Sequence, residues 1–136
     1  MRDVRGLVPH AGAMCLLDRV LEHSAEHVRC SARSHREPDN PLLADEGLPA
    51  HAGIEYAAQA TAVHAALMQG GAPVAGMLAG VRRARFLVRR LNEVEGTLIV
   101  SAQLFARDAA ALIYTFDIAS EGAMLLEGKL TIALLR

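Results

Sequence analysis

A chain of 136 residues has the length of one domain, and about half of its residues (52%) are apolar, which is enough for one sizeable core. The formal net charge of -1 argues against a general nucleic-acid or membrane-surface binder, and no stretch approaches the roughly 20 apolar residues of a membrane-spanning helix. The N-terminus lacks the apolar segment of a signal peptide, so we expect a cytoplasmic protein.

The first third of the chain predicts two strands followed by a loop. Residues 14–20 open with four apolar side chains that Asp18 and Arg19 follow, and we interpret this segment as a strand. Val28, Cys30 and Ala32 alternate with polar residues, which is typical of a half-buried strand. Residues 37–49 contain three prolines and Gly47, and this composition predicts a loop.

Residues 51–69 carry the one long helical pattern, which Gly70 and Gly71 end. Seven alanines spread small apolar groups over several faces of this helix, and Glu55 is its only charged residue other than histidine. An ordinary surface helix has one apolar stripe and one charged face. We therefore expect this helix to be wrapped on most sides.

Four further strands are predicted, over residues 74–88, 97–106, 111–118 and 124–134, with the first interrupted near Gly76 and Gly80. The order of two strands, one buried helix and four strands indicates an α+β protein. An antiparallel sheet curled around one long central helix satisfies this order, so we predict a single hotdog domain over residues 1–136.

Glu55 is the strongest candidate for chemistry. A carboxylate in the first turn of a buried, alanine-rich helix is costly unless it is paired or used. The alternative is an exposed glutamate that only complements the helix dipole. The small and apolar neighbours of Glu55 favour a functional role.

Three of the six histidines are candidates to act with Glu55. His51 precedes Glu55 by one helical turn on the same face. His35 lies where a predicted strand enters the loop, and His10 precedes the first predicted strand. We interpret His64 as a core or interface residue, because nine positions place it on the helix face opposite Glu55.

No metal or cofactor is expected. His51 and Glu55 have a spacing that would suit two ligands on one helical face, but no further cluster completes a tetrahedral set. Cys15 and Cys30 lack metal-ligand spacing and are interpreted as small core residues.

Two segments resemble the bacterial 3-hydroxyacyl-[acyl-carrier-protein] dehydratases. Residues 7–10 (LVPH) with 14–20 (MCLLDRV) are similar to the opening of that family, and residues 48–59 (LPAHAGIEYAAQ) to the start of its helix. The chain also resembles the divergent branch that accompanies aryl polyene synthesis, in residues 35–42 (HREPDNPL) and 53–56 (GIEY). The resemblance implies a hotdog enzyme that dehydrates a 3-hydroxyacyl thioester to a trans-2-enoyl thioester.

The family's roles carry over to matching positions. The resemblance implies that Glu55 is the proton donor and that a histidine opposite it is the base. The family's Gly-His-Phe-Pro-Gly loop is replaced here by residues 44–47 (ADEG). We therefore expect His35 to act as the base, with His51 as the second choice. The substrate would be held by His10, Gly53, Gln59 and the backbone N–H groups around Ala50.

The fold also implies partners. One hotdog unit leaves a sheet edge and one side of the acyl tunnel open, so we expect a dimer with an identical or related hotdog subunit. The basic residues Arg82, Arg83 and Arg85 are candidates to dock an acyl carrier protein, although they suit a solvated strand face equally well.

Two alternatives stay open. The chain lacks the family's Gly-His-Phe-Pro-Gly loop, and this absence would suit a non-catalytic subunit of a mixed dimer. A thioesterase would use the same helix carboxylate to activate water.

Overall fold

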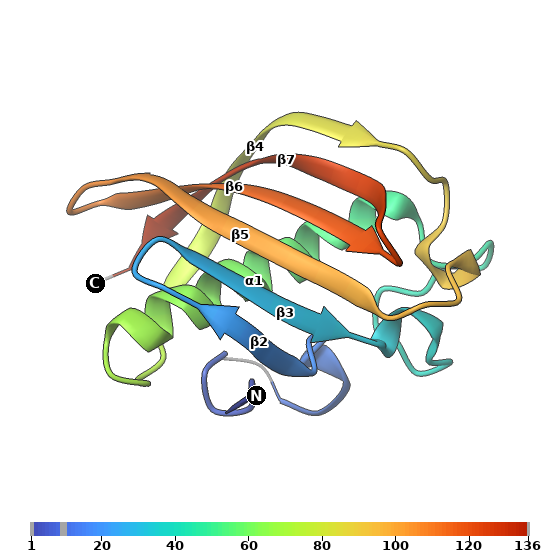
Figure 1. The fold of residues 1–136 in the computed structure, drawn as a ribbon, viewed down its shortest axis with the longest axis horizontal. Helices are drawn as coiled ribbons and strands as arrows, with labels where there is room; N and C mark the ends of the chain where they lie inside the picture. Colours follow the sequence, from blue (N-terminus) through green and yellow to red (C-terminus); the bar gives the residue numbers. More distant parts are fainter. Residues whose placement is uncertain (1, 9–10, 136) are drawn as a thin grey trace.

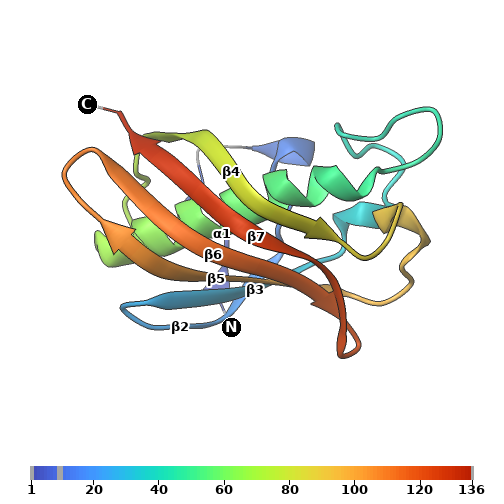
Figure 2. The same cartoon turned by 90° about the horizontal axis from the view of Figure 1, so that it is seen from above.

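One antiparallel sheet curves around one helix in the computed structural model, which describes residues 2–8 and 11–135 (Figure 1). His10 therefore lies outside the described residues. In spatial order the seven strands among them are β1 (Arg2–Asp3), β2 (Arg19–His23), β3 (His27–Ala32), β5 (Leu98–Arg107), β6 (Ala111–Ser120), β7 (Ala123–Leu134) and β4 (Gly76–Phe86). The helix α1 (Gly53–Met68) follows the 3₁₀ turn η3 (Ala50–Ala52) and lies against one face of the sheet (Figure 2). This is the predicted hotdog arrangement.

The core lies between α1 and the inner face of the sheet. Alternate residues of β6 point inward, and Tyr114, Phe116 and Ile118 are buried as the sequence predicts. Gly53 allows α1 to approach the sheet closely, because a Cβ at this position would lie 2.9 Å from both terminal methyl carbons of Leu126. The helix contributes four small or branched residues to this core, which are Ala57, Ala60, Val63 and Ala66.

The strand predicted over residues 14–20 is wrong in its position. Residues Gly12–Met14 form the 3₁₀ turn η1, and β2 begins only at Arg19. Leu16 and Leu17 are buried, but they cross the helix as irregular chain that the Gln59 side chain holds. A buried apolar run without alternation is compatible with this path as well as with a strand.

The other elements agree with prediction to within a few residues. In β4 the sheet register shifts at Leu78/Gly80, as expected near Gly80, and again at Arg82/Arg85, where Arg83 has a φ of 54°. A shift at Ile118/Ala119 breaks the predicted alternation at the start of β7, so Met124 is exposed and Leu125 is buried.

The two edges of the sheet differ in length and exposure. One edge is the short strand β1, with two residues, and the other is β4, with eleven. Exposed apolar side chains accompany the long edge, namely Met77, Val81, Phe86 and, just beyond the strand, Leu87. An edge strand with unpaired backbone groups and exposed apolar side chains favours pairing with another chain. Within the described residues, no helix is long and apolar enough to cross a membrane.

Candidate active site

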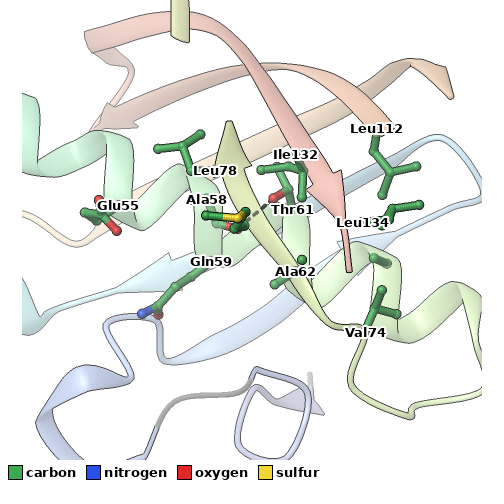
Figure 3. A pocket seen from close by; sticks show the side chains of 13 residues that line it. Glu55, Ala58, Gln59, Thr61, Ala62, Val74, Leu78, Leu112, Ile132 and Leu134 are labelled. Carbon is green, nitrogen blue, oxygen red and sulfur yellow. Dashed lines mark hydrogen bonds between the residues drawn. The ribbon is translucent and has the colours of Figure 1, made fainter. Parts of the chain in front are cut away.

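A pocket of about 200 Å³ lies between one face of α1 and the strands β4, β6 and β7 (Figure 3). Small helix residues form one wall, and Leu78, Leu112 and Ile132 form the other. Glu55 stands at one end of the pocket, and Val74 and Leu134 lie at the other. The pocket therefore combines an apolar channel with one carboxylate.

Glu55 is exposed in the single subunit, so the expectation of a buried carboxylate is wrong for this state. The side of α1 that carries Glu55 also carries the half-buried residues Ala58, Ala62 and Ala65, and this side faces the pocket. The helix is thus wrapped by its own chain on all sides except the pocket side. Desolvation of Glu55 would require another molecule to cover the pocket.

Gln59, a predicted substrate contact, borders the pocket, and its amide group holds the N-terminal segment. Its side chain is buried and points away from the channel toward the N-terminal segment (Figure 3). Its Oε1 accepts a hydrogen bond from the Leu16 N–H at 2.9 Å, and its Nε2 donates to the Met14 carbonyl at 2.7 Å. Because both ends of the amide bind backbone, Gln59 fixes residues 14–16 across the helix.

His35, the first choice for the base, does not line the pocket that contains Glu55. It lies in the 3₁₀ turn η2 (Ser34–Arg36), is 2% exposed, and its Nε2 donates to the Val94 carbonyl at 2.9 Å. Its Nδ1 is buried without a hydrogen-bond partner among the described residues. The structure therefore gives His35 a core position that ties η2 to the turn η4 (Leu91–Glu93) and the residue after it.

The start of the helix has fewer free backbone N–H groups for a thioester carbonyl oxygen than the sequence predicts. The Ala50 N–H donates to the Arg89 carbonyl and the Ala52 N–H to the Pro49 carbonyl, both at 3.0 Å. Gly53, a predicted substrate contact, packs against the sheet and does not line this pocket. His51 is exposed, one turn before Glu55, and among the described residues its N–H has no backbone partner in this turn.

His64 is a core residue, as predicted. It is fully buried, its Nδ1 lies 2.7 Å from the Tyr114 hydroxyl, and its Nε2 lies 3.0 Å from the Ser24 carbonyl. Because a carbonyl only accepts, Nε2 carries the proton in the neutral ring and Nδ1 accepts from Tyr114.

The three arginines predicted to dock a carrier protein are exposed on β4. Arg82 pairs in register with Lys129 and Arg85 with Glu127, and Arg85 lies 3.3 Å from the Glu127 carboxylate. Arg83 lines a shallow hollow with the same two residues on the face of the sheet opposite α1. These side chains therefore do not surround the opening of the Glu55 pocket.

A polar network that we did not predict joins the loop to the helix. Asn40 donates to the Tyr56 hydroxyl at 2.9 Å, and the Ser34 hydroxyl lies 2.6 Å from the same oxygen. Asn40 and Tyr56 belong to the two segments that resemble the aryl polyene branch. The shared pattern thus marks a contact that fixes the residues beside Glu55.

We expect stability to fall in mild acid because of two histidines. Burial lowers the pKa of both His35 and His64 below its ordinary value. A histidine whose pKa is depressed on folding contributes stability that is fully present above its unfolded pKa of about 6.5. This contribution is lost as pH falls from that value through the lowered pKa of the folded state. Urea unfolding at pH 7.5 and 5.5 should show this loss. In His64→Gln, the free energy of unfolding should differ less between pH 7.5 and pH 5.5 than it does in the wild type. The exposed His23→Gln serves as control, and an equal effect of both variants would contradict the assignment.

Comparisons with known proteins agree with this architecture. A search of curated proteins finds no match. A chain of the dehydratase heterocomplex ApeI:P from Xenorhabdus doucetiae superposes with a TM-score of 0.87 and 27% identity, covering 100% of this chain and 93% of that one. A hypothetical thioesterase from Streptococcus pneumoniae, solved with coenzyme A, has a TM-score of 0.63 and 11% identity, with 86% and 84% covered.

A thioesterase from Pseudomonas aeruginosa has a TM-score of 0.60 and 17% identity, with 86% of this chain and 80% of that chain covered. At such identities the two thioesterases show the hotdog fold alone. The family model described as ApeP-like, ApeP dehydratase, matches residues 2–134, almost the whole chain. On this match, the chain belongs to the ApeP-like family of dehydratases.

Proposed function

We propose that this dehydratase acts on a 3-hydroxyacyl thioester at the Glu55 pocket, in fatty-acid or polyene-type synthesis. The observation that carries the proposal is the position of Glu55 at one end of an apolar channel lined by α1, β4, β6 and β7. The channel suits an acyl chain, and the carboxyl group at its mouth suits proton transfer at the carbons next to the thioester.

The reaction requires one proton to leave C2 and one hydroxyl to leave C3. A base takes the C2 proton, the C2–C3 double bond forms, and the hydroxyl departs as water after it receives a proton from Glu55. Negative charge develops on the thioester carbonyl oxygen during this step. The His51 N–H at the start of the helix, which has no backbone partner among the described residues, is the donor that we assign to that oxygen.

We assign the base to an imidazole at the open side of the pocket. Among the histidines of the described residues, none lines the pocket, and His51 is the nearest to Glu55 along the helix. Two side chains one turn apart lie about 5–6 Å from each other at their Cβ atoms, which leaves room for the two reacting carbons. An imidazole from a second subunit is the other source, and a His51→Gln variant distinguishes the two.

A second hotdog subunit completes the site in this proposal. The structural similarity to a dehydratase heterocomplex supports a mixed dimer with a related hotdog subunit. The exposed apolar edge β4, which also lines the pocket through Met77 and Leu78, is the surface that we assign to the partner. Covering this side would shield Glu55 and the reacting carbons from bulk water.

The assembly is testable at the β4 edge. Met77→Lys with Val81→Lys should weaken dimer formation at least about 10-fold, because two desolvated charges would replace apolar contacts. Sedimentation of the chain, alone and mixed with its partner subunit, measures this effect. Phe105→Lys places a charge on a more exposed apolar residue of β5 and should not change the dissociation constant. A monomeric wild-type chain that binds no related subunit would contradict the assembly.

We further propose that the acyl group arrives on a carrier protein and that the protein works in the cytoplasm. Cys15 and Cys30 are both free thiols, which suits a reducing compartment. The Arg82, Arg83 and Arg85 triple alanine variant tests docking on β4. The exposed Arg89 lies next to the start of the helix, because its carbonyl accepts a hydrogen bond from the Ala50 N–H. Carrier-protein binding by Arg89→Ala is therefore the matched comparison.

One observation favours a non-catalytic subunit as the second candidate. The described residues place no imidazole in the pocket beside Glu55. In this case the chain would shape the active site of its partner, and Glu55 would serve the helix dipole alone.

Hydration of a four-carbon trans-2-enoyl thioester tests the proposed function. The loss of the conjugated double bond is followed by ultraviolet absorbance, with the chain alone and with its partner subunit. We expect hydration that depends on Glu55 of this chain. Hydration by the mixed dimer that survives Glu55→Gln would support the non-catalytic role.

A further inference from the structure

The face of the sheet that points away from α1 forms a second surface, which we call the outer face (Figure 2 shows α1 on the other side of the sheet). Along β3, β5, β6 and β7 its side chains alternate with those buried in the core, and they are mostly exposed or half-buried. Because neighbouring strands pair in a fixed register, these side chains form rows that cross the sheet.

Two adjacent rows in the middle of the outer face carry most of its polar groups. From β3 to β4, the first row consists of Arg29, Ser101, Asp117, Glu127 and Arg85. The second row consists of His27, Gln103, Thr115, Lys129 and Arg82. On β6 and β7 the first row is therefore acidic, and the second row places a lysine beside it on β7.

The subunit does not neutralise these central charges by itself. Asp117 is half-buried, and no ion pair joins it to another of the described residues. Burial raises the pKa of the Asp117 carboxyl, and the carboxylate of Glu127, its partner in register, raises it further. Lys129 Nζ lies 3.9 Å from the centre of the Phe105 ring and has no carboxylate partner among the described residues.

The pattern of the two rows is complementary to itself. A two-fold axis that runs across the strands, between the rows, places the first row of one copy over the second row of another. Glu127 of each copy then faces Lys129 of the other copy, so one operation forms two opposite-charge contacts. The same operation brings Asp117 to Thr115, whose hydroxyl can donate a hydrogen bond to the carboxylate.

Apolar side chains flank the two rows on both sides. Ile99, Ala119 and Met124 lie beside the first row, and Met124 is 38% exposed. Ile113 and Phe105 lie beside the second row, and Phe105 is 63% exposed. The two-fold axis that matches the charges also places one apolar strip over the other. Apolar surface therefore meets apolar surface where charge meets charge.

The outer face is large enough for a stable contact between two copies. Five neighbouring strands from β3 to β4, spaced about 4.8 Å apart, and ten residues of about 3.3 Å each cover roughly 19 by 33 Å. This is about 600 Å² before the relief of the side chains is added, and a stable interface buries about 800 Å² per partner. Two sheets that meet face to face in this way pack as the layers of a sandwich do.

We propose that the outer face binds the outer face of a second copy of this chain, so that two mixed dimers join into an assembly of four subunits. This contact lies away from the Glu55 pocket and does not depend on the proposed reaction. The backbone edge of β4 stays open for the related subunit. Arg82 and Arg85 come to lie at the rim, where water and salt screen their charges.

Charge reversal tests the contact. Sedimentation equilibrium of the chain with its partner subunit, at micromolar concentration, should give the mass of four subunits. In Glu127→Lys, and separately in Lys129→Glu, like charges face each other twice, and the dissociation constant should rise at least about 10-fold. Glu127→Lys combined with Lys129→Glu exchanges the charges in both copies, so the opposite-charge contacts form again and the dissociation constant should return close to the wild-type value.

The control is Glu46→Lys, which makes the same change at an exposed position in the loop before the helix and should leave the mass unchanged. Phe105→Lys, which leaves the β4 contact intact, should weaken the outer-face contact. Met77→Lys with Val81→Lys should do the reverse, releasing the related subunit and leaving pairs of this chain. Urea unfolding of each variant verifies that it is folded.

Two results would overturn the outer-face contact. One is a wild-type complex that contains a single copy of this chain at micromolar concentration. The other is a Glu127→Lys and Lys129→Glu double variant that associates as weakly as the single variants. Hydration of the four-carbon substrate should be the same in all the charge variants, because none of these residues lines the Glu55 pocket. Absence of hydration would overturn the proposed function and leave the outer-face contact standing.

Discussion

Replacing Glu55 by glutamine should lower the hydration rate of a trans-2-enoyl thioester by about 10² to 10⁴, the usual contribution of a positioned general acid or base. Glutamine has nearly the same shape, so the variant removes proton transfer and leaves the channel intact. Because Glu55 is exposed in the subunit, the free energy of unfolding should stay within about 0.5 kcal/mol of the wild type.

The control for this variant is Glu95→Gln, which removes a carboxylate from another exposed position outside the pocket. It should leave both rate and stability unchanged. Ultraviolet absorbance assays of the hydration rate and urea unfolding compare the two variants. A Glu55→Gln protein with the wild-type rate would remove Glu55 from the reaction.

Replacing Gln59 by leucine should lower the free energy of unfolding by about 2–4 kcal/mol, because two backbone groups lose their partners. Leu16 is 3% exposed, so its N–H would be left buried, while the Met14 carbonyl belongs to a residue that is 46% exposed and regains water more easily. The N-terminal segment before β2 should then detach first. Hydrogen exchange at residues 11–17 should quicken more than exchange in β5 or β6.

Gln103→Leu is the matched control, because Gln103 is exposed on β5. Within the described residues, its side-chain amide makes no hydrogen bond like those of Gln59. Its free energy of unfolding should change by no more than about 0.5 kcal/mol. Equal stability of Gln59→Leu and Gln103→Leu would show that the Gln59 amide does not hold the segment.

Local patterns in the sequence predict most of the fold. The alternation of Tyr114, Phe116 and Ile118 with polar residues sets the faces of β6, and Gly70 with Gly71 marks the end of the helix. The apolar residues 14–17 mislead, because burial alone does not distinguish a strand from irregular chain held by a side chain. That side chain, Gln59, lies 43 positions from Leu16, and no local pattern connects the two.

The candidate site is less accessible from the sequence. A lone carboxylate in an alanine-rich helix is unusual and marks Glu55 as a candidate, but its exposure depends on a surface that a partner would cover. The place of His35 in the chain predicts a base, whereas its bond to Val94 spans 59 positions. The contact between His64 and Tyr114 also spans 50 positions, and only the folded chain brings these two side chains together.

The most direct test of the dehydratase assignment is product analysis by mass spectrometry. A 3-hydroxyacyl pantetheine thioester is incubated with the chain and its partner subunit, and the masses of thioester, free acid and free thiol are followed. We predict loss of one water with the thioester bond intact, and no such loss when Glu55 of this chain is glutamine. Release of free thiol and acid, or water loss that continues in the Glu55→Gln complex, would contradict the account.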